Sequence, residues 1–548
     1  MATDDCEAPS LLLALPDDCL LPILQYCAAN GQHSLFSAAR AHSRLHQAAV
    51  AALRSITAPV TRQQQLDSVL LYLSKHGDHT NSVEFKGDGD YRATLRQLPQ
   101  HLQLSSFHLS DVQVQLLPGN GFQGVLSATA QQAPLKQLRL DSCMLLDSVS
   151  GGELAAALTV LPAGLEHLSI CNLRCNGEIV QFPTAILQQL QQLTYLELAD
   201  VSVLGPGKAS PVLQPLQALT RLQHLCLHSV RTEEDGGMVA AAILSGPTHL
   251  THLQLSAGLG LFDDEAVWNV EPGVLAGKTR LQHLHLAQCN IVGGAAGIAQ
   301  LLCGLQQLQQ LTYLNLSYSL EAHNHYDDRV QDPDSTPPAA AYAALTASSN
   351  LQQLDITGAV LPEGVWQHIF PAGRQRAHLR SLDISHVQHQ DGTAAAAPEG
   401  SRLVSCCPGL QSINMQQLQY SEELLDSVQG LSGLHTLHLG MSRHSEAPVS
   451  LEGVRHLTGL RMLRVVLPAT AKEGLLLQLT ALKQLDTLIY RGPTGCTAGM
   501  VCLSQVGWGV GCFPCLLMIA SSHGRQHQAL LAPCRQLLGV NAWHAHTQ

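Results

Sequence analysis

Apolar residues recur along this chain in one short pattern, Leu-x-x-Leu-x-Leu, which appears thirteen times with conservative replacements. Its last three positions are apolar, polar and apolar, which is the period of a β-strand with one buried face. One copy would carry little weight in a chain so rich in leucine, whereas thirteen copies at near-constant spacing predict internal repeats. The first leucines of the copies are Leu135, Leu165, Leu193, Leu222, Leu250, Leu281, Leu311, Leu351, Leu379, Leu410, Leu434, Leu460 and Leu485.

A degenerate copy precedes these, with Leu104 in the first position and Phe107 and Leu109 in the other two. From Leu104 onward, successive copies begin 24 to 40 residues apart, and most spacings are 28 to 31 residues. The segments between the copies include helix-compatible stretches such as 295–310 and 238–246. Strand, return segment and next strand are therefore expected to stack into an α/β solenoid, a horseshoe with a parallel sheet on its concave side.

This arrangement resembles the leucine-rich-repeat family across residues 104–493. The family often places Asn or Cys eight residues after the first leucine, and Cys143 and Cys289 occupy that slot here. Other copies hold apolar residues there, Val201 and Val230 among them, so the family's polar ladder is largely missing. The resemblance implies a binding scaffold, in which each repeat buries its apolar face against its neighbours.

Four spacings depart from the usual length, and the composition of the chain changes after the last repeat. The 40-residue spacing contains 321–338, an acidic, proline-containing insertion that predicts a protruding loop. The last spacings of 24 to 26 residues leave room only for short returns, so the curvature is expected to change there. Residues 494–548 form a Cys- and Gly-rich extension, for which we expect irregular structure. Its uncharged stretch 499–522 is too rich in glycine to predict a membrane span, and the pairs Cys512–Cys515 and His523–His527 are too loosely organised to predict a zinc module.

A helical module is predicted at residues 11–57, after a disordered segment at 1–10 and before a linker and N-terminal cap at 58–103. Leu20, Ile23, Leu24 and Cys27 fall at helical spacing, and Pro16 suits the start of a helix. After Asn30-Gly31, a second helical stretch runs from about Leu35 onward. The simplest interpretation is a cap over the exposed end of the solenoid.

The same segment also resembles an F-box, through Leu-Pro-Asp-x-x-Leu-x-x-Ile-Leu, a polar break, Leu-x-x-Ala-Ala and Ser-Arg-Leu. It departs from that family at Pro22, inside the first helix, and at Leu45-His46, near the usual Trp. The resemblance implies docking onto a Skp-type adaptor of a cullin-RING ligase, with the repeats as the substrate-recognition subunit of an SCF-type ubiquitin ligase. The adaptor-binding positions would be Leu15, Pro16, Leu20, Ile23, Leu24, Leu35 and Leu45.

Outward-facing strand positions are the candidate partner-binding residues. The slot before the second leucine holds His or Tyr in six consecutive copies, flanked by Gln137 and Gln353, and the next outward slot holds polar residues. Adjacent strands lie about 4.8 Å apart, so these rings would form a ribbon suited to a peptide or protein partner. The alternative is that duplicated repeats simply carry histidine, of which the chain has 28. The candidates are His167, Tyr195, His224, His252, His283, His285, Tyr313, Asp355 and Asp383.

A linear ladder of histidines is poor zinc geometry, so no metal site is expected. Clustered imidazoles would make binding sensitive to pH near neutrality. We find no Walker loop, G-x-S-x-G or H-E-x-x-H motif, and we expect neither catalysis nor a cofactor. The net charge of −12 argues against a nucleic-acid binder, and the N-terminus lacks the basic region of a secretory signal.

The 16 cysteines lie largely in repeat and helix positions, which indicates reduced thiols in an intracellular protein, cytoplasmic or nuclear, with no membrane partner. Three functions stay open. The first is recruitment of a target to a ubiquitin ligase. The second is a non-ligase ciliary or cytoskeletal scaffold whose first helices are only a cap. The third is a small-ligand receptor of the kind that some plant F-box repeat proteins resemble.

Overall fold

The structure is a computed structural model in which the chain forms two compact units, each described here by itself. The first comprises Met1–Leu250 with Ala257–Ala266, and the second comprises Thr251–Ser256 with Val267–Gln548. The residues described are Leu20, Ile23, Leu24, Ala49, 54–89, 92–95, 98–99, 102–116, 135–146, 151–204, 213–232, 238–239, 241–257, 268–321, 337–419, 422–440, 452–466, 482, 484–491 and 499–502.

The first unit is built on a parallel sheet whose strands pair in chain order. Each strand buries apolar side chains at its second and fourth positions, as the alternating pattern predicts, and in β8 and β14 the residues between them, Ser169 and Cys226, are buried as well. The strands are β1 (Ser55–Pro59), β2 (Ser82–Lys86), β4 (Ser106–Ser110), β6 (Gln137–Asp141), β8 (His167–Cys171), β12 (Tyr195–Ala199) and β14 (His224–His228).

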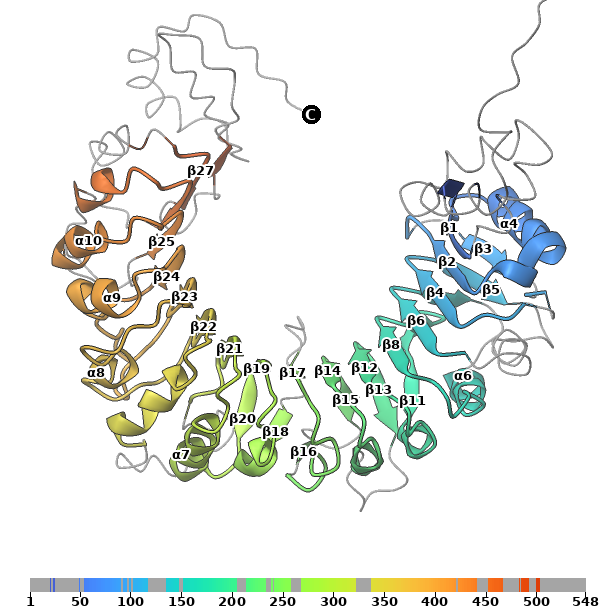
Figure 1. The fold of residues 1–548 in the computed structure, drawn as a ribbon, viewed down its shortest axis with the longest axis horizontal. Helices are drawn as coiled ribbons and strands as arrows, with labels where there is room; N and C mark the ends of the chain where they lie inside the picture. Colours follow the sequence, from blue (N-terminus) through green and yellow to red (C-terminus); the bar gives the residue numbers. More distant parts are fainter. Residues whose placement is uncertain are drawn as a thin grey trace, which may run out of the picture. The chain divides into compact units, whose positions relative to one another are not determined.

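Further strands and helices cover the other sides of the first unit (Figure 1). A second sheet contains β3 (Arg92–Leu95), β5 (Gln113–Leu116), β7 (Met144–Leu146), β9 (Arg174–Cys175) and β10 (Glu178–Ile179). A third contains β11 (Gln181–Pro183), β13 (Ser202–Leu204) and β15 (Arg231–Thr232). The remaining elements are α4 (Gln63–His76), α6 (Gly151–Leu158), β16 (Met238–Val239) and the 3₁₀-helices η2 (Gly77–His79), η3 (Thr184–Gln188) and η4 (Gln214–Ala218).

The second unit repeats the same plan, with a parallel sheet in chain order and helical returns on the other side (Figure 1). Its sheet strands are β17 (His252–Ser256), β19 (His283–Ala287), β21 (Tyr313–Asn315), β22 (Gln353–Asp355), β23 (Ser381–Asp383), β24 (Ser412–Gln416), β25 (Thr436–Gly440), β26 (Met462–Val466) and β27 (Thr487–Arg491). The strand β28 (Gly499–Cys502) then pairs with β27 in the antiparallel direction.

The returns of the second unit mix short α-helices and 3₁₀-helices, and β18 (Trp268–Val270) pairs in parallel with β20 (Cys289–Ile291). Its helical elements are η5 (Pro272–Leu275), α7 (Gly294–Leu305), η6 (Ala339–Thr346), α8 (Trp366–Ile369), α9 (Gly400–Cys406), α10 (Glu422–Val428) and η7 (Glu452–His456). Helix α7 confirms the helix expected within 295–310. The helix expected at 238–246 is wrong, because that segment forms β16 and a turn in which the carbonyl of Ala242 accepts a hydrogen bond from the Gln217 side chain.

The parallel-sheet solenoid read from the leucine pattern is confirmed within each unit. Every predicted first leucine, Leu104 included, is buried and lies two residues before the start of a sheet strand. In the degenerate copy, Phe107 and Leu109 are buried as expected. The sheet also begins earlier than predicted, because β1 and β2 precede Leu104 and place Ile56, Ala58, Val83 and Phe85 in the buried positions.

A column of left-handed residues follows the sheet strands, one after nearly every strand. It includes Asp111, Ser142 and Asn172 in the first unit and Tyr318 and His386 in the second, all with φ between 46° and 59°. In the first unit, the backbone N–H of such a residue donates to the carbonyl oxygen of the last residue of the next strand, as from Ser142 to Cys171 over 2.9 Å, whereas Tyr318 donates to Thr357, just beyond β22. The column therefore turns the chain out of the sheet at the same level in each repeat.

Gly358 occupies this column in the repeat after Tyr318, with a φ of 70°. A Cβ atom built on Gly358 would lie 2.4 Å from Cδ1 and Cε1 of Tyr318, so the tyrosine ring covers the glycine closely. Gly373 also has a positive φ, of 80°, but a Cβ atom there would meet no heavy atom within 4 Å. The two glycines therefore separate the effect of backbone conformation from the effect of the ring.

We expect Gly358→Ala to lower the free energy of unfolding of the second unit by about 2–4 kcal/mol, through the left-handed backbone and the clash together. Gly373→Ala is expected to cost only about 1–2 kcal/mol. Adding Tyr318→Ala to Gly358→Ala should recover the difference, because the ring is then absent. Urea unfolding followed by circular dichroism measures each variant. Equal costs at the two glycines would contradict this account.

Candidate binding surface on the sheet face

A column of stacked rings runs across the sheet of the first unit. His167, Tyr195 and His224 are the first residues of β8, β12 and β14, and the strand register places them side by side. The ring centroids of His167 and Tyr195 are 3.9 Å apart with an interplanar angle of 7°, and those of Tyr195 and His224 are 4.2 Å apart at 11°. The column predicted from the sequence is therefore present in this unit.

The second unit carries a matching column. His252, His283 and Tyr313 begin β17, β19 and β21, and their registers again bring the rings together. The centroids are 5.4 Å apart for the two histidines and 4.0 Å apart for His283 and Tyr313, the latter with an interplanar angle of only 1°. His285, from the next outward slot, lies 6.3 Å from Tyr313.

Stacking decides what these columns offer to a partner. Both faces of Tyr195 are covered by imidazoles, so the ring edges and polar atoms are what remain available. Two-ring pairs of this kind contribute about 0.5–1.5 kcal/mol each beyond their buried area, which holds the rings in fixed positions. The surface is thus rigid and rich in hydrogen-bonding groups. Because the rings are already ordered, binding of a polar partner would cost little side-chain entropy.

Glu197 lies beside the middle ring of the first column, two residues after Tyr195 on β12. Its Oε2 accepts hydrogen bonds from the hydroxyls of Ser169, at 2.8 Å, and Tyr195, at 2.9 Å. Burial alone would raise the pKa of Glu197, but these hydrogen bonds and the charges of Arg139 and His224 lower the pKa below its ordinary value. Glu197 is therefore a fixed, half-buried negative charge beside the rings.

Burial lowers the pKa of two ring-column histidines, His167 and His252. For His167, the charge of Arg139 lowers the pKa further, while Glu197 raises it. These imidazoles therefore stay neutral at pH 7, and their protonation moves to lower pH than the sequence pattern suggested. A neutral His252 avoids charge repulsion with the His283 ring, whose centroid is 5.4 Å away.

A row of polar side chains occupies the second outward position of adjacent strands in the second unit. Asp355 and Asp383 are opposite each other in the register of β22 and β23. Asn315 donates to Asp355 over 3.1 Å, and Asn414 donates to Asp383 over 2.7 Å. Burial, followed by the charge of Asp383, raises the pKa of Asp355, although hydrogen bonds from Thr357 lower it. The two predicted acidic residues therefore form one continuous polar strip with their neighbours.

Sequence reasoning missed the hydroxyl residues that complete these networks. Thr357 Oγ1 lies 2.7 Å from Oδ1 of Asp355 and 2.9 Å from Oδ1 of Asp383, and Ser385 donates to Asp383 over 2.6 Å. The backbone N–H groups of Thr357 and Ser385 also donate to Asp355 and Asp383. The signal was available as a repeated Leu-Asp-Ile-Thr and Leu-Asp-Ile-Ser, in which the hydroxyl follows the acid by two residues.

The remaining predicted positions are only partly described. Leu20 and Leu24 are buried, while Ile23 is 41% exposed. Leu15, Pro16, Leu35 and Leu45 lie outside the described residues, as do 322–336 of the acidic insertion and the pairs Cys512–Cys515 and His523–His527. Within the described residues, no group of three His, Cys, Asp or Glu side chains could hold a metal ion, and no helix is long and apolar enough to cross a membrane.

Two cysteines, Cys143 and Cys289, lie eight residues after the first leucine of their repeats, and both thiols are buried. Cys289 Sγ donates to the carbonyl oxygens of Leu255, at 3.4 Å, and Ala287, at 3.5 Å. Cys143 Sγ donates to the carbonyl of Asp141 over 3.1 Å, and burial raises the pKa of this thiol to about 12. Both cysteines are free, so they act as small buried side chains that bond backbone.

No protein-family model matches the chain, and no curated protein sequence is significantly similar to it. Among solved structures, it is similar to a leucine-rich-repeat protein of Leptospira interrogans, with a TM-score of 0.48 and 14% identity over 80% of this chain and 90% of that one. It is also similar to an internalin of Listeria monocytogenes, with a TM-score of 0.36 and 16% identity over 62% of this chain and 89% of that one.

Proposed function

We propose that the chain is a protein-binding scaffold that holds a polar segment of a partner protein across its sheet faces. The observation that carries this proposal is the stacked ring column of each unit, fixed in place and bordered by hydrogen-bonded carboxylates. Rigid aromatic and imidazole groups give binding area and hydrogen bonds at little cost in side-chain entropy. In this proposal the chain performs no bond chemistry and needs no cofactor.

Comparative co-purification tests the face directly. The variant His224→Ala with His252→Ala and His283→Ala removes rings from both columns, while a control variant carries Gln188→Ala and Gln307→Ala, at exposed positions of the returns. Proteins recovered from a cell extract with wild type and control, but reduced at least about tenfold with the ring variant, are face partners. If the ring variant retains the same proteins in the same amounts, the rings are not a binding surface.

We also propose, from the F-box resemblance of residues 11–57, that the scaffold recruits its target to an SCF-type ubiquitin ligase through a Skp-type adaptor. Such a subunit would raise the effective concentration of the target beside the ligase. The burial of Leu20 and Leu24 suits a helix that packs onto the chain, and the exposure of Ile23 leaves an apolar group for a partner. The competing scaffold proposal, in which these helices are only a cap, accounts for the burial of Leu20 and Leu24 but not for the exposure of Ile23.

We expect Ile23→Asp to reduce co-purification of a Skp adaptor at least tenfold, because it puts a charge into an apolar contact without altering the buried leucines. Ile23→Leu is the matched control and should retain the adaptor. Leu20→Asp is a poor probe, since burying its charge would unfold the module. Folded wild-type protein that recovers no adaptor would leave the cap as the role of these helices.

A further inference from the structure

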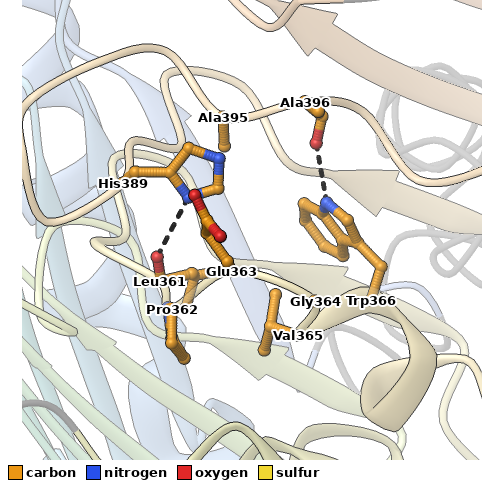
Figure 2. A pocket seen from close by; sticks show the side chains of 9 residues that line it. All are labelled: Leu361, Pro362, Glu363, Gly364, Val365, Trp366, His389, Ala395 and Ala396. Atoms are coloured by element: carbon orange, nitrogen blue, oxygen red, sulfur yellow. Dashed lines mark hydrogen bonds between the residues drawn. The ribbon is translucent and has the colours of Figure 1, made fainter.

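A pocket of about 310 Å³ opens in the second unit, beside the segments that follow β22 and β23. Its walls come from two consecutive repeats, 361–366 and 389–396. Figure 2 shows the Trp366 indole on one side of the pocket and the His389 imidazole on the other, with Val365 below and Ala395 above. The volume is at the low end for ligand sites, so it suits one large side chain better than a large ligand.

Hydrogen bonds between the two repeats fix the rings of this pocket. The indole Nε1 of Trp366 donates to the carbonyl oxygen of Ala396 over 2.7 Å, and His389 Nδ1 lies 3.4 Å from the carbonyl oxygen of Leu361 (Figure 2). The backbone N–H of His389 donates to the carbonyl oxygen of Thr393 over 2.8 Å, which closes the turn that carries the imidazole. The pocket is therefore formed before any ligand enters, which lowers the cost of binding.

Glu363 gives the pocket its charge. Its side chain is exposed and forms no hydrogen bond or ion pair with any residue in the described part of the chain, and no lysine or arginine lines the pocket. Glu363 and Trp366 line the same pocket, so the carboxylate can attract a cation through its charge and the indole through its ring face. The net charge of −12 adds a general attraction for a cationic partner.

We propose that this pocket binds the guanidinium side chain of an arginine on a partner protein. A planar guanidinium stacks on an indole and offers paired N–H donors to a carboxylate, which an ammonium group does not match. Val365 and Ala395 would contact the methylene stem of the arginine. The site uses none of the ring-column residues, so it can be tested whether or not the sheet face binds a partner.

Fluorine NMR of the full chain labelled with 5-fluorotryptophan tests the site. The chain has four tryptophans, and Trp366→Phe identifies the resonance of Trp366. We expect Nα-acetyl-arginine N-methylamide to shift this resonance saturably, with a dissociation constant of about 1 mM or weaker for so small a probe. Glu363→Gln should weaken the probe about three- to tenfold, whereas Glu423→Gln, an exposed glutamate of the same unit, should leave it unchanged.

The citrulline analogue keeps the shape of arginine but removes its charge. The dissociation constant measured from the Trp366 resonance should be at least fivefold higher for citrulline than for arginine. Equal responses to arginine and citrulline would overturn the proposal, because charge would then play no part. Equal responses to arginine and the corresponding lysine compound would overturn the assignment to a guanidinium. No saturable shift of the Trp366 resonance by arginine would remove the site altogether.

Discussion

Replacing Trp268 with alanine is expected to lower the free energy of unfolding of the second unit by about 3–5 kcal/mol. Trp268 is 1% exposed, lies on β18 opposite Cys289 of β20, and is among the largest fully buried side chains. Its removal would leave a cavity that the stacked repeats on either side can fill only in part. Thermal and urea unfolding followed by circular dichroism measure the loss.

Trp268→Phe is the informative comparison, because the indole Nε1 of Trp268 is buried without a hydrogen-bond partner among the described residues. Phenylalanine removes less volume than alanine does, and it also removes the unsatisfied donor. We therefore expect Trp268→Phe to cost less than about 2 kcal/mol. A loss below about 1 kcal/mol for Trp268→Ala would show that the side chain is not packed as described.

Tyr195→Ala is the second change with a large expected effect, because Tyr195 contacts both neighbouring rings and donates to Glu197. Losing two stacked pairs and one hydrogen bond to a carboxylate should lower the free energy of unfolding of the first unit by about 2–4 kcal/mol. The same change removes the middle of the ring column, so recovery of the face partners should fall with it. Differential scanning calorimetry and quantitative co-purification measure the two effects.

Tyr195→Phe separates stacking from hydrogen bonding at this position. The phenyl ring keeps its contacts with His167 and His224, so stability should fall by only about 0.5–1.5 kcal/mol. The pKa of Glu197 should rise from its lowered value, because one of the two hydroxyls that stabilise its charge is gone. Carbon-detected NMR titration of labelled glutamate follows this shift. If the pKa of Glu197 does not change, the Tyr195 hydroxyl does not stabilise the charged form of this carboxylate.

The sheet strands were predictable because each buries leucines at fixed positions, and leucine is easy to count. The register followed from the same spacing, so the neighbours of Tyr195 and His283 in the ring columns could be named in advance. Strands β1 and β2 were not predicted, because Ile56, Ala58 and Val83 occupy the buried positions that leucine fills in the other strands. Their contacts replace leucine packing, for example where Phe85 meets Phe107 edge to face at 6.3 Å.

The rest depends on contacts that one sequence does not reveal. The left-handed column contains Asp, Ser, Asn, Gln, Tyr and His, which share a backbone conformation and a polar side chain but no single functional group. The segment 238–246 has helical composition, but a side chain from the preceding repeat occupies one of its carbonyl groups. The Trp366 pocket joins residues about 30 positions apart through backbone carbonyls, which leave no trace in residue type.

The antiparallel strand β28 limits how the ladder can grow. A parallel strand at the end of a stack exposes N–H and C=O groups in the spacing that another repeat, or another molecule, would match. In β28, Cys502 lies opposite Thr487 and Gly499 lies opposite Tyr490, so the chain direction is reversed at the last strand that the structure describes. Because β28 pairs with this edge of β27, a parallel repeat cannot pair with β27 there, and β27 is shielded from becoming a template for end-to-end fibre assembly.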